Sequence, residues 1–160
     1  MNPALGAFLL FLGAASAWAQ SSNSFGYVFG GVTYVPASGF TRWDGSFVSI
    51  GGGGEAAIGR YVTAGGEAVV LAPASNRFAR TSGMATGGVS VFPVRSRKAE
   101  PFFSGGAGAL VSGDGALVGY AGGGVHYWFQ ARVGMRLEYR HHFTDRSIQL
   151  VGFRAGLVFR

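Results

Sequence analysis

Near the end of the chain, four neighbouring side chains have types that could do chemistry: His141, His142, Thr144 and Asp145. A histidine can activate a hydroxyl group as a nucleophile when a nearby acid orients its ring. On a β-strand, residues two apart share a face, so His142 and Thr144 would lie side by side. Threonine is an unusual nucleophile in such a set, and paired histidines also suit the water interface at a strand end. We interpret them as interface residues and keep catalysis as an alternative.

The charged residues around this segment alternate with apolar ones. From 133 to 143 the odd positions are mostly apolar or aromatic, whereas the even positions include Arg136, Glu138 and Arg140. After a short polar break the alternation resumes, and Arg154 falls on the charged side. A period of two predicts two long strands joined by a turn. The charged face would meet solvent in a soluble sandwich, but it would line the lumen of a membrane barrel.

The N-terminal sequence predicts export of the chain. An apolar stretch at 4–13 is followed by small residues that end in Ala-Trp-Ala at 17–19. This is the pattern of a secretory signal peptide, which the cell removes. We therefore expect residues 1–19 to be a signal peptide and residues 20–160 to form one domain.

The composition excludes several classes of protein. There is no cysteine, so neither disulfides nor cysteine metal clusters can hold the fold together, and no motif points to a cofactor. The net charge of +6 suggests an anionic partner such as nucleic acid or lipid, but the arginines are scattered singly, which argues against nucleic acid. Glycine occurs 29 times, and each glycine weakens a helix by about 1 kcal/mol relative to alanine. The glycine content favours an all-β chain.

Alternating segments separated by turn residues predict eight strands in the exported domain. Their expected ranges are 25–34, 47–58, 61–71, 79–92, 101–111, 117–129, 133–143 and 151–159. Short connections between successive strands favour antiparallel neighbours. An even number of strands can close into an up-and-down barrel, which removes the exposed sheet edges. The prediction is an all-β, eight-stranded antiparallel up-and-down transmembrane β-barrel, preceded by the signal peptide.

Aromatic residues gather near the expected strand ends, as they do at the two interfaces of membrane barrels. The end that holds both termini would carry Tyr61, Phe92, Phe102, Phe103, Trp128, Phe129 and Phe159, and the opposite end Tyr34, Trp43, Phe47, Phe78 and Phe143. We expect these side chains to form two belts. The alternative is that they fill the core of a soluble protein.

Four segments of the sequence carry a family resemblance. They are PFFSGGAGAL at 101–110, GYAGGGVHY at 119–127, RLEYR at 136–140 and GFRAGLVF at 152–159. These segments resemble the bacterial outer-membrane β-barrel domain family, the small OmpA-like and OmpX-like barrels. The resemblance implies a porin-like, eight-stranded barrel in the bacterial outer membrane, with short periplasmic turns. The partners it implies are outer-membrane lipids, lipopolysaccharide, periplasmic chaperones and the barrel-assembly machinery.

The chain departs from this family at its last residue. Members commonly finish on an aromatic residue that the assembly machinery recognises, whereas here Phe159 is followed by Arg160. The departure bears on how efficiently the barrel inserts.

The alternation of faces along each predicted strand places one set of ionisable side chains on the expected lumen face. The set is Glu55, Glu67, His126, Arg132, Arg136, Glu138, Arg140 and Arg154. An eight-stranded barrel is only wide enough for its own side chains, so we expect these charges to pair and plug the lumen. Across the strands we expect Arg136 opposite Gly124 and Glu138 opposite Gly122, because small residues beside long ones let the lumen pack.

These expectations lead to an integral outer-membrane barrel of structural or undefined interaction role, without metal or cofactor. One alternative is a small gated pore through the charged lumen. Another is enzymatic, because some barrels of this size are lipid A acylhydrolases and this chain resembles them at 137–142. Their pattern has a serine two residues after the histidine, where this chain has Thr144. A soluble lipocalin-like barrel would need an apolar interior, and here the interior is the charged face.

Overall fold

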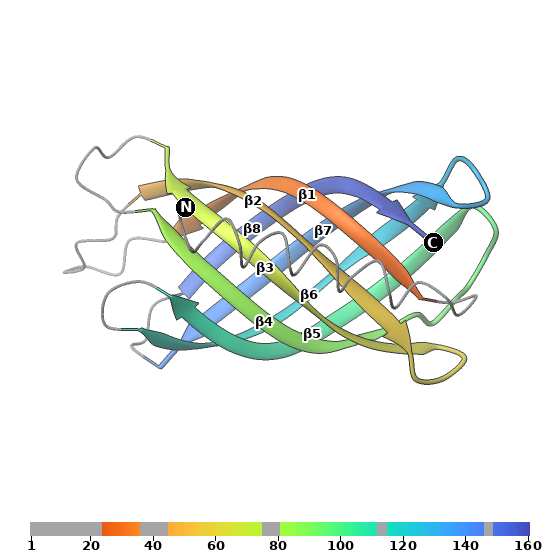
Figure 1. The fold of residues 1–160 in the computed structure, drawn as a ribbon, viewed down its shortest axis with the longest axis horizontal. Helices are drawn as coiled ribbons and strands as arrows, with labels where there is room; N and C mark the ends of the chain where they lie inside the picture. Colours follow the sequence, from red (N-terminus) through yellow and green to blue (C-terminus); the bar gives the residue numbers. More distant parts are fainter. Residues whose placement is uncertain (1–23, 36–44, 75–80, 112–114, 146–148) are drawn as a thin grey trace, which may run out of the picture.

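The computed structural model describes residues 24–35, 45–74, 81–111, 115–145 and 149–160. Within them the chain forms a closed barrel in which each strand pairs antiparallel with its sequence neighbours and β1 pairs with β8 (Figure 1). The strands are β1 (Phe25–Val35), β2 (Gly45–Ala57), β3 (Val62–Pro73), β4 (Ser82–Val91), β5 (Ala99–Val111), β6 (Ala116–Trp128), β7 (Val133–Thr144) and β8 (Gln149–Phe159). The predicted all-β, eight-stranded antiparallel barrel is confirmed. In the described part of the chain, no helix is long and apolar enough to cross a membrane.

The two faces of the sheet differ sharply in chemistry. Large apolar side chains cover the outside, with exposed fractions of 57% for Val32, 65% for Ile50 and 69% for Leu117. The inside holds charged residues such as Arg140, whose exposed fraction is 1%. A soluble protein rarely exposes a continuous apolar surface, whereas a barrel in lipid has this inside-out arrangement. The strands are 10 to 13 residues long, which is enough for tilted strands to cross a bilayer.

The two ends of the barrel differ in their connections. At one end, at the right in Figure 1, lie the β2–β3, β4–β5 and β6–β7 connections (58–61, 92–98 and 129–132) together with Arg160. We call this end the turn rim. The opposite end, where β1, β3, β5 and β7 finish, is the loop rim.

Two strand boundaries differ from the prediction because of proline. β3 runs through Pro73, and β5 begins at Ala99, two residues before the expected start at Pro101. Pro73 is the last residue of β3. Pro101 precedes Phe103, the first residue of β5 that pairs with β4, so Pro101 has no partner on that strand. Proline is tolerated at such positions on the margin of a sheet. Of the predicted fourth strand, residues 79 and 80 lie outside the described residues.

Four of the predicted belt aromatics are in the lumen instead. Phe47, Phe92, Phe102 and Trp128 have exposed fractions of 6%, 0%, 1% and 4%. Each lies two residues from an inward polar side chain, as Phe102 does from Ser104. Because residues two apart on a strand point to the same face, each of these aromatics also points inward. The predicted belt aromatics that do face outward are Tyr61, Phe103, Phe129 and Phe159 near the turn rim and Tyr34 and Phe143 near the loop rim. Trp43 and Phe78 lie outside the described residues.

The inward aromatic and aliphatic residues belong to one apolar cluster, and most of them lie in two layers, one near each end of the lumen. The turn-side layer consists of Phe25, Phe92, Phe102, Trp128 and Val158, and the loop-side layer of Val35, Phe47, Leu71, Met84, Val118 and Leu150. Every one of these side chains is at most 8% exposed. The charged residues of the lumen are therefore flanked by apolar packing on both sides.

Candidate functional site in the lumen

Six of the eight predicted lumen residues come together inside the barrel. They are Glu55 of β2, Glu67 of β3, Arg136, Glu138 and Arg140 of β7, and Arg154 of β8, each at most 7% exposed. Because alternate residues of a strand point to the same face, β7 supplies an Arg-Glu-Arg column. Glu55, Glu67 and Arg154 approach this column from other strands.

Glu138 lies at the centre of the column and accepts bonds from both flanking arginines. The Nε of Arg136 is 3.2 Å from one carboxylate oxygen, and the Nη2 of Arg140 is 2.7 Å from the other. Ser104 of β5 donates its hydroxyl to the same carboxylate over 3.1 Å. One carboxylate thus joins two guanidinium groups that would otherwise repel each other.

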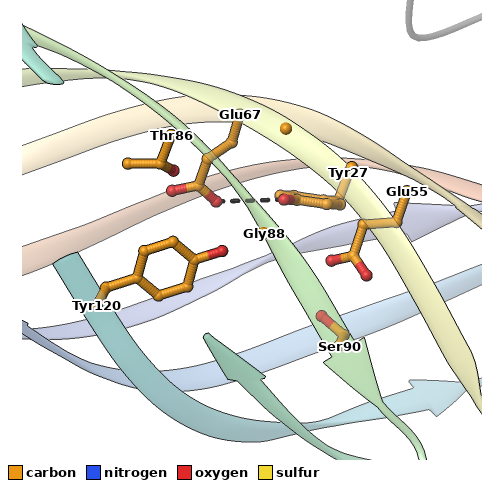
Figure 2. Close-up of a pocket in the computed structure, with 9 residues that line it drawn as sticks. Tyr27, Glu55, Glu67, Thr86, Gly88, Ser90 and Tyr120 are labelled. Carbon is orange, nitrogen blue, oxygen red and sulfur yellow. Dashed lines mark hydrogen bonds between the residues drawn. The ribbon is translucent and has the colours of Figure 1, made fainter. Parts of the chain in front are cut away.

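Glu67 is shared in a similar way by two arginines from β7 and β8. Its Oε1 accepts from Arg140 Nη1 at 2.6 Å and from Arg154 Nη1 at 2.7 Å. Figure 2 shows the Tyr27 hydroxyl pointing toward the same carboxylate, to which it donates over 3.2 Å. The carboxylate of Glu67 therefore has a partner on each oxygen.

Glu55 completes the series. It accepts a bond from the Nη1 of Arg136 at 3.3 Å and another from the hydroxyl of Thr63. The result is an ion-pair chain that alternates in sign across the lumen, in the order Glu55, Arg136, Glu138, Arg140, Glu67 and Arg154. Three acids balance three arginines in this chain. Buried charges tolerate loss of water only when they are paired in this manner.

Aromatic rings cover the flat faces of the same arginines. The guanidinium carbon of Arg140 lies 4.1 Å from the ring centre of Tyr120, and that of Arg154 lies 4.5 Å from Phe29. Arg136 lies 4.2 Å from Tyr27 and also stacks against Phe102. Such cation–π contacts strengthen when water is excluded. The rings fix each guanidinium in its plane and fill the space between charges.

The register between β6 and β7 differs from the prediction by two residues. Glu138 lies opposite Gly124 and Arg140 opposite Gly122, while Arg136 faces His126. The shift of two leaves every side chain on its expected face. The principle that glycine makes room still holds, since a Cβ on Gly122 would lie 2.5 Å from the Tyr139 carbonyl oxygen and 3.2 Å from the Cγ of Arg140.

His126 lies in the turn-side layer rather than among the charges. Its ring centre is 4.8 Å from Phe25, 4.9 Å from Phe102 and 5.9 Å from Trp128. The Nη1 of Arg136 is 3.2 Å from its Nε2. Because arginine can only donate, Nε2 acts as the acceptor. His126 therefore links the ion-pair chain to the aromatic layer.

Arg132 does not belong to the lumen, which corrects the prediction. It is exposed and lies in the connection before β7, whose first residue is Val133. Its carbonyl oxygen accepts a bond from the backbone N–H of Arg160 at 3.0 Å. The alternation of inward and outward side chains holds only within a strand, and β7 begins at Val133. The inward column of β7 therefore starts at Gly134.

Glu100 is the acid that the sequence reasoning missed. It is 4% exposed, accepts a bond from Trp128 Nε1 at 2.9 Å and lies 3.7 Å from Arg160 Nη1. The predicted strand ranges leave Glu100 in the connection between residues 92 and 101, although it alternates in step with the inward Phe102 and Ser104. Tyr27, Tyr120 and Ser104 are further contributors to the lumen whose inward parity was readable from the sequence.

Two arginines cover the turn-side layer. Arg160 lies 4.0 Å over the ring of Trp128, and Arg95 lies 4.4 Å over the ring of Phe92. Burial lowers the pKa of the Arg95 guanidinium from its ordinary value, and the nearby charge of Glu100 opposes this shift. These two side chains lie over the turn-side end of the packed lumen.

The geometry at His142 does not resemble a hydrolase site. His142 is 1% exposed, faces the lumen and lies 6.0 Å from the ring of Tyr120, so it is not at the water interface as expected. Both of its ring nitrogens are buried without a hydrogen-bond partner among the described residues. His141 faces outward beside Phe143. A general base must reach the proton that it removes, and among the described residues neither ring nitrogen of His142 has a hydroxyl within hydrogen-bond distance.

A small cavity lies beside the ion-pair chain (Figure 2). It is lined by Tyr27, Glu55, Gly65, Gly66, Glu67, Thr86, Gly88, Ser90 and Tyr120, and its volume is about 10 Å³. That is room for roughly one water molecule. Buried donors without a protein partner, among them Nη2 of Arg136 and Nε of Arg154, are groups that internal water usually satisfies. In the described residues no cluster of three or more His, Cys, Asp or Glu could hold a metal ion.

Comparison with solved structures places this fold among known proteins. Neisserial surface protein A matches with a TM-score of 0.68 and 10% identity, over 87% of this chain and 97% of that one. The N-terminal β-barrel domain of OprF from Pseudomonas aeruginosa matches with a TM-score of 0.60 and 12% identity, over 86% and 98%. This chain has the fold of the small outer-membrane barrels. Ail, the attachment invasion locus protein of Yersinia pestis, matches with a TM-score of 0.55 and 10% identity, over 85% and 95%. No family model and no curated protein sequence matches the chain.

Proposed function

We propose that the chain is an integral protein of the bacterial outer membrane, with a closed lumen and a structural role or a role in surface contacts. The observation that carries this proposal is the ion-pair chain, in which every acid is paired and apolar layers flank the charges on both sides. An ion would have to break these pairs and pass the layers. The apolar outer surface and the shared fold of the small outer-membrane barrels support the location.

The membrane location has a direct test. In the outer-membrane fraction, the folded protein should resist unboiled SDS and migrate differently after boiling, because a closed barrel has no free edge where unfolding can start. A protein that stays soluble without detergent would contradict the proposal.

The closed lumen is tested separately by single-channel recording in planar bilayers. We expect no steady conductance from the parent protein, because the ion-pair chain crosses the lumen and the inward apolar side chains of the described residues pack on both sides of it. The variant Glu138→Gln removes the acid shared by Arg136 and Arg140, and it should open more often if the chain is a gate. Steady conductance of the parent would favour the second candidate function, a small gated pore, and would reject the closed lumen.

A further inference from the structure

The charges of this chain are scattered in the sequence but gathered in space. The turn rim carries Arg60, Arg95, Arg97, Lys98, Arg132 and Arg160, and among the described residues Glu100 is the one acid at this end. Six cations against one acid leave five of the net six positive charges at the turn rim. In the lumen the three arginines and three glutamates of the ion-pair chain cancel.

The connections that follow β1, β3, β5 and β7 show no comparable excess in the sequence. They contain Arg42, Arg77, Arg80 and Arg146 against Asp44, Asp114 and Asp145, which leaves one positive charge. Counted by sequence, the turn rim and these connections differ by four positive charges.

The cations of the turn rim are placed for contact outside the barrel. Arg60, Arg97, Lys98 and Arg132 are exposed, and within the described residues none of them takes part in an ion pair. By contrast, Arg160 is held by Trp128 and Glu100 at the end of the lumen, and Arg95 lies over Phe92. Four positive side chains therefore have no counter-charge in the part of the chain that the structure describes.

These four cations lie next to a ring of outward aromatic side chains. Tyr61 follows Arg60, whose guanidinium lies 5.2 Å over its ring, and Phe129 lies in the same connection as Arg132. Lys98 precedes Ala99, which pairs with the outward Tyr127. Aromatic rings at the ends of membrane strands mark the level of the lipid headgroups. The cations are thus at the depth of lipid phosphates.

The connections are too short to carry these charges far from the membrane. Those of β2–β3 and β6–β7 have four residues each, and that of β4–β5 has seven. The cations come from all three connections, so they surround the barrel instead of forming one patch. A ring of charge at headgroup depth matches a ring of lipids better than a single macromolecular ligand.

From this arrangement we propose that the turn rim is a binding surface for anionic phospholipid headgroups, such as phosphatidylglycerol, in the adjoining leaflet. Lysine and arginine side chains next to an anionic membrane surface each strengthen association, roughly fivefold. The four exposed cations recruit these lipids, while Arg95 and Arg160 remain part of the lumen cover. This property concerns the membrane around the barrel and does not depend on whether the lumen is closed.

The test compares lipid retention in three proteins. The parent, the rim variant Arg97→Gln/Lys98→Gln/Arg132→Gln and the control variant Arg42→Gln/Arg77→Gln/Arg80→Gln are placed in nanodiscs of equal phosphatidylglycerol and phosphatidylcholine. Both variants lose three positive charges, but only the first loses them from the β4–β5 and β6–β7 connections of the turn rim. The ratio of the two lipids retained after mild detergent extraction is read by native mass spectrometry. Unboiled SDS migration confirms that each barrel is folded.

We expect the parent and the control variant to retain phosphatidylglycerol preferentially and the rim variant to lose this preference by at least about threefold, since exposed charges act mainly through such contacts. Equal retention by the rim variant and the parent would overturn the proposal, as would an equal loss in the control variant. A third result would also overturn the proposal. In it, the rim variant keeps its lipid preference but no longer binds purified peptidoglycan.

The parent alone supplies a second measurement if the rim variant does not fold. Its preference for phosphatidylglycerol should weaken when NaCl rises from about 0.05 M to about 0.5 M, because salt screens exposed charges. A parent with no preference at low salt, or with one that salt leaves unchanged, would reject the turn rim as the lipid-binding surface.

Discussion

At the scale of single residues, Glu138 has the most consequences for the lumen. It separates Arg136 from Arg140 and accepts bonds from both, as well as from Ser104. Its removal would leave two guanidinium groups on the same strand face with fewer counter-charges. Arg136 would keep Glu55, and Arg140 would keep Glu67.

We predict that Glu138→Ala destabilises the folded barrel strongly. Removing one partner of a buried ion pair typically costs about 3 to 5 kcal/mol, and internal water would reduce the figure. Urea unfolding in lipid vesicles, followed by tryptophan fluorescence, measures the effect. Asp145→Ala is the matched control, since Asp145 is exposed at the end of β7 and its loss should change the free energy of unfolding little. Equal urea midpoints for both variants and the parent would place Glu138 outside a closed network.

A second prediction concerns His142. Because both ring nitrogens are buried without a partner in the described residues, the barrel should release no fatty acid from lipid A. Mass spectrometry of lipid A after incubation with the reconstituted protein checks this. Release that disappears in His142→Ala would revive the acylhydrolase alternative.

Much of the lumen at this scale was readable from parity alone. Arg136, Glu138, Arg140 and Arg154 lie on the predicted face because their strands are long and regular. Arg132 and Glu100 were misplaced because each is within two residues of a strand end. The alternation along a strand predicts which face a residue is on, but it does not predict where the strand ends.

At the scale of the strands, β4 shows what the glycines do. Gly88 faces inward, and a Cβ there would lie 2.5 Å from the Gly105 carbonyl oxygen and against the Tyr120 hydroxyl. Its neighbour Gly87 faces outward, where a Cβ would meet an atom no nearer than 3.6 Å. Packing in the lumen thus requires glycine at the inward position 88, whereas nothing crowds a larger side chain at the outward position 87.

We predict that Gly88→Ala destabilises the barrel by about 1 to 3 kcal/mol, the usual cost of overpacking a filled interior. Gly87→Ala should be neutral or stabilise by a few tenths of a kcal/mol, because alanine has less freedom in the unfolded chain. The comparison uses the same urea assay. Similar losses in both variants would mean that glycine at these sites serves the bending of the strand rather than lumen packing.

The strands themselves were more predictable than the aromatic belts. Alternation over about a dozen residues defined all eight to within a few residues, because a period of two persists whether the lumen is polar or not. The prediction of the aromatic belts was wrong for Phe47, Phe92, Phe102 and Trp128. Nearness to a strand end does not determine whether a side chain faces the lumen or the lipid. An aromatic near the end of a strand fills the lumen or meets lipid according to its parity.

At the scale of the whole molecule, the signal peptide stays a prediction, because residues 1–23 lie outside the described residues. We predict that the protein in outer-membrane fractions begins at Gln20, since the Ala-Trp-Ala sequence before it fits the cleavage pattern. Intact mass spectrometry measures this, allowing for cyclisation of the N-terminal glutamine. A mass that includes Met1 would exclude cleavage.

The pairing of β1 with β8 sets an order of events during synthesis. β1 finds one neighbour in β2 soon after it emerges, but its other edge waits for β8, from the pair Gly26–Phe159 to the pair Tyr34–Val151. If the chain leaves the cytoplasm N-terminus first, that edge of β1 travels unpaired until the last residues arrive. Any unpaired strand edge can join a neighbouring chain. We therefore expect delivery of this barrel to require protection of that edge of β1 during transit.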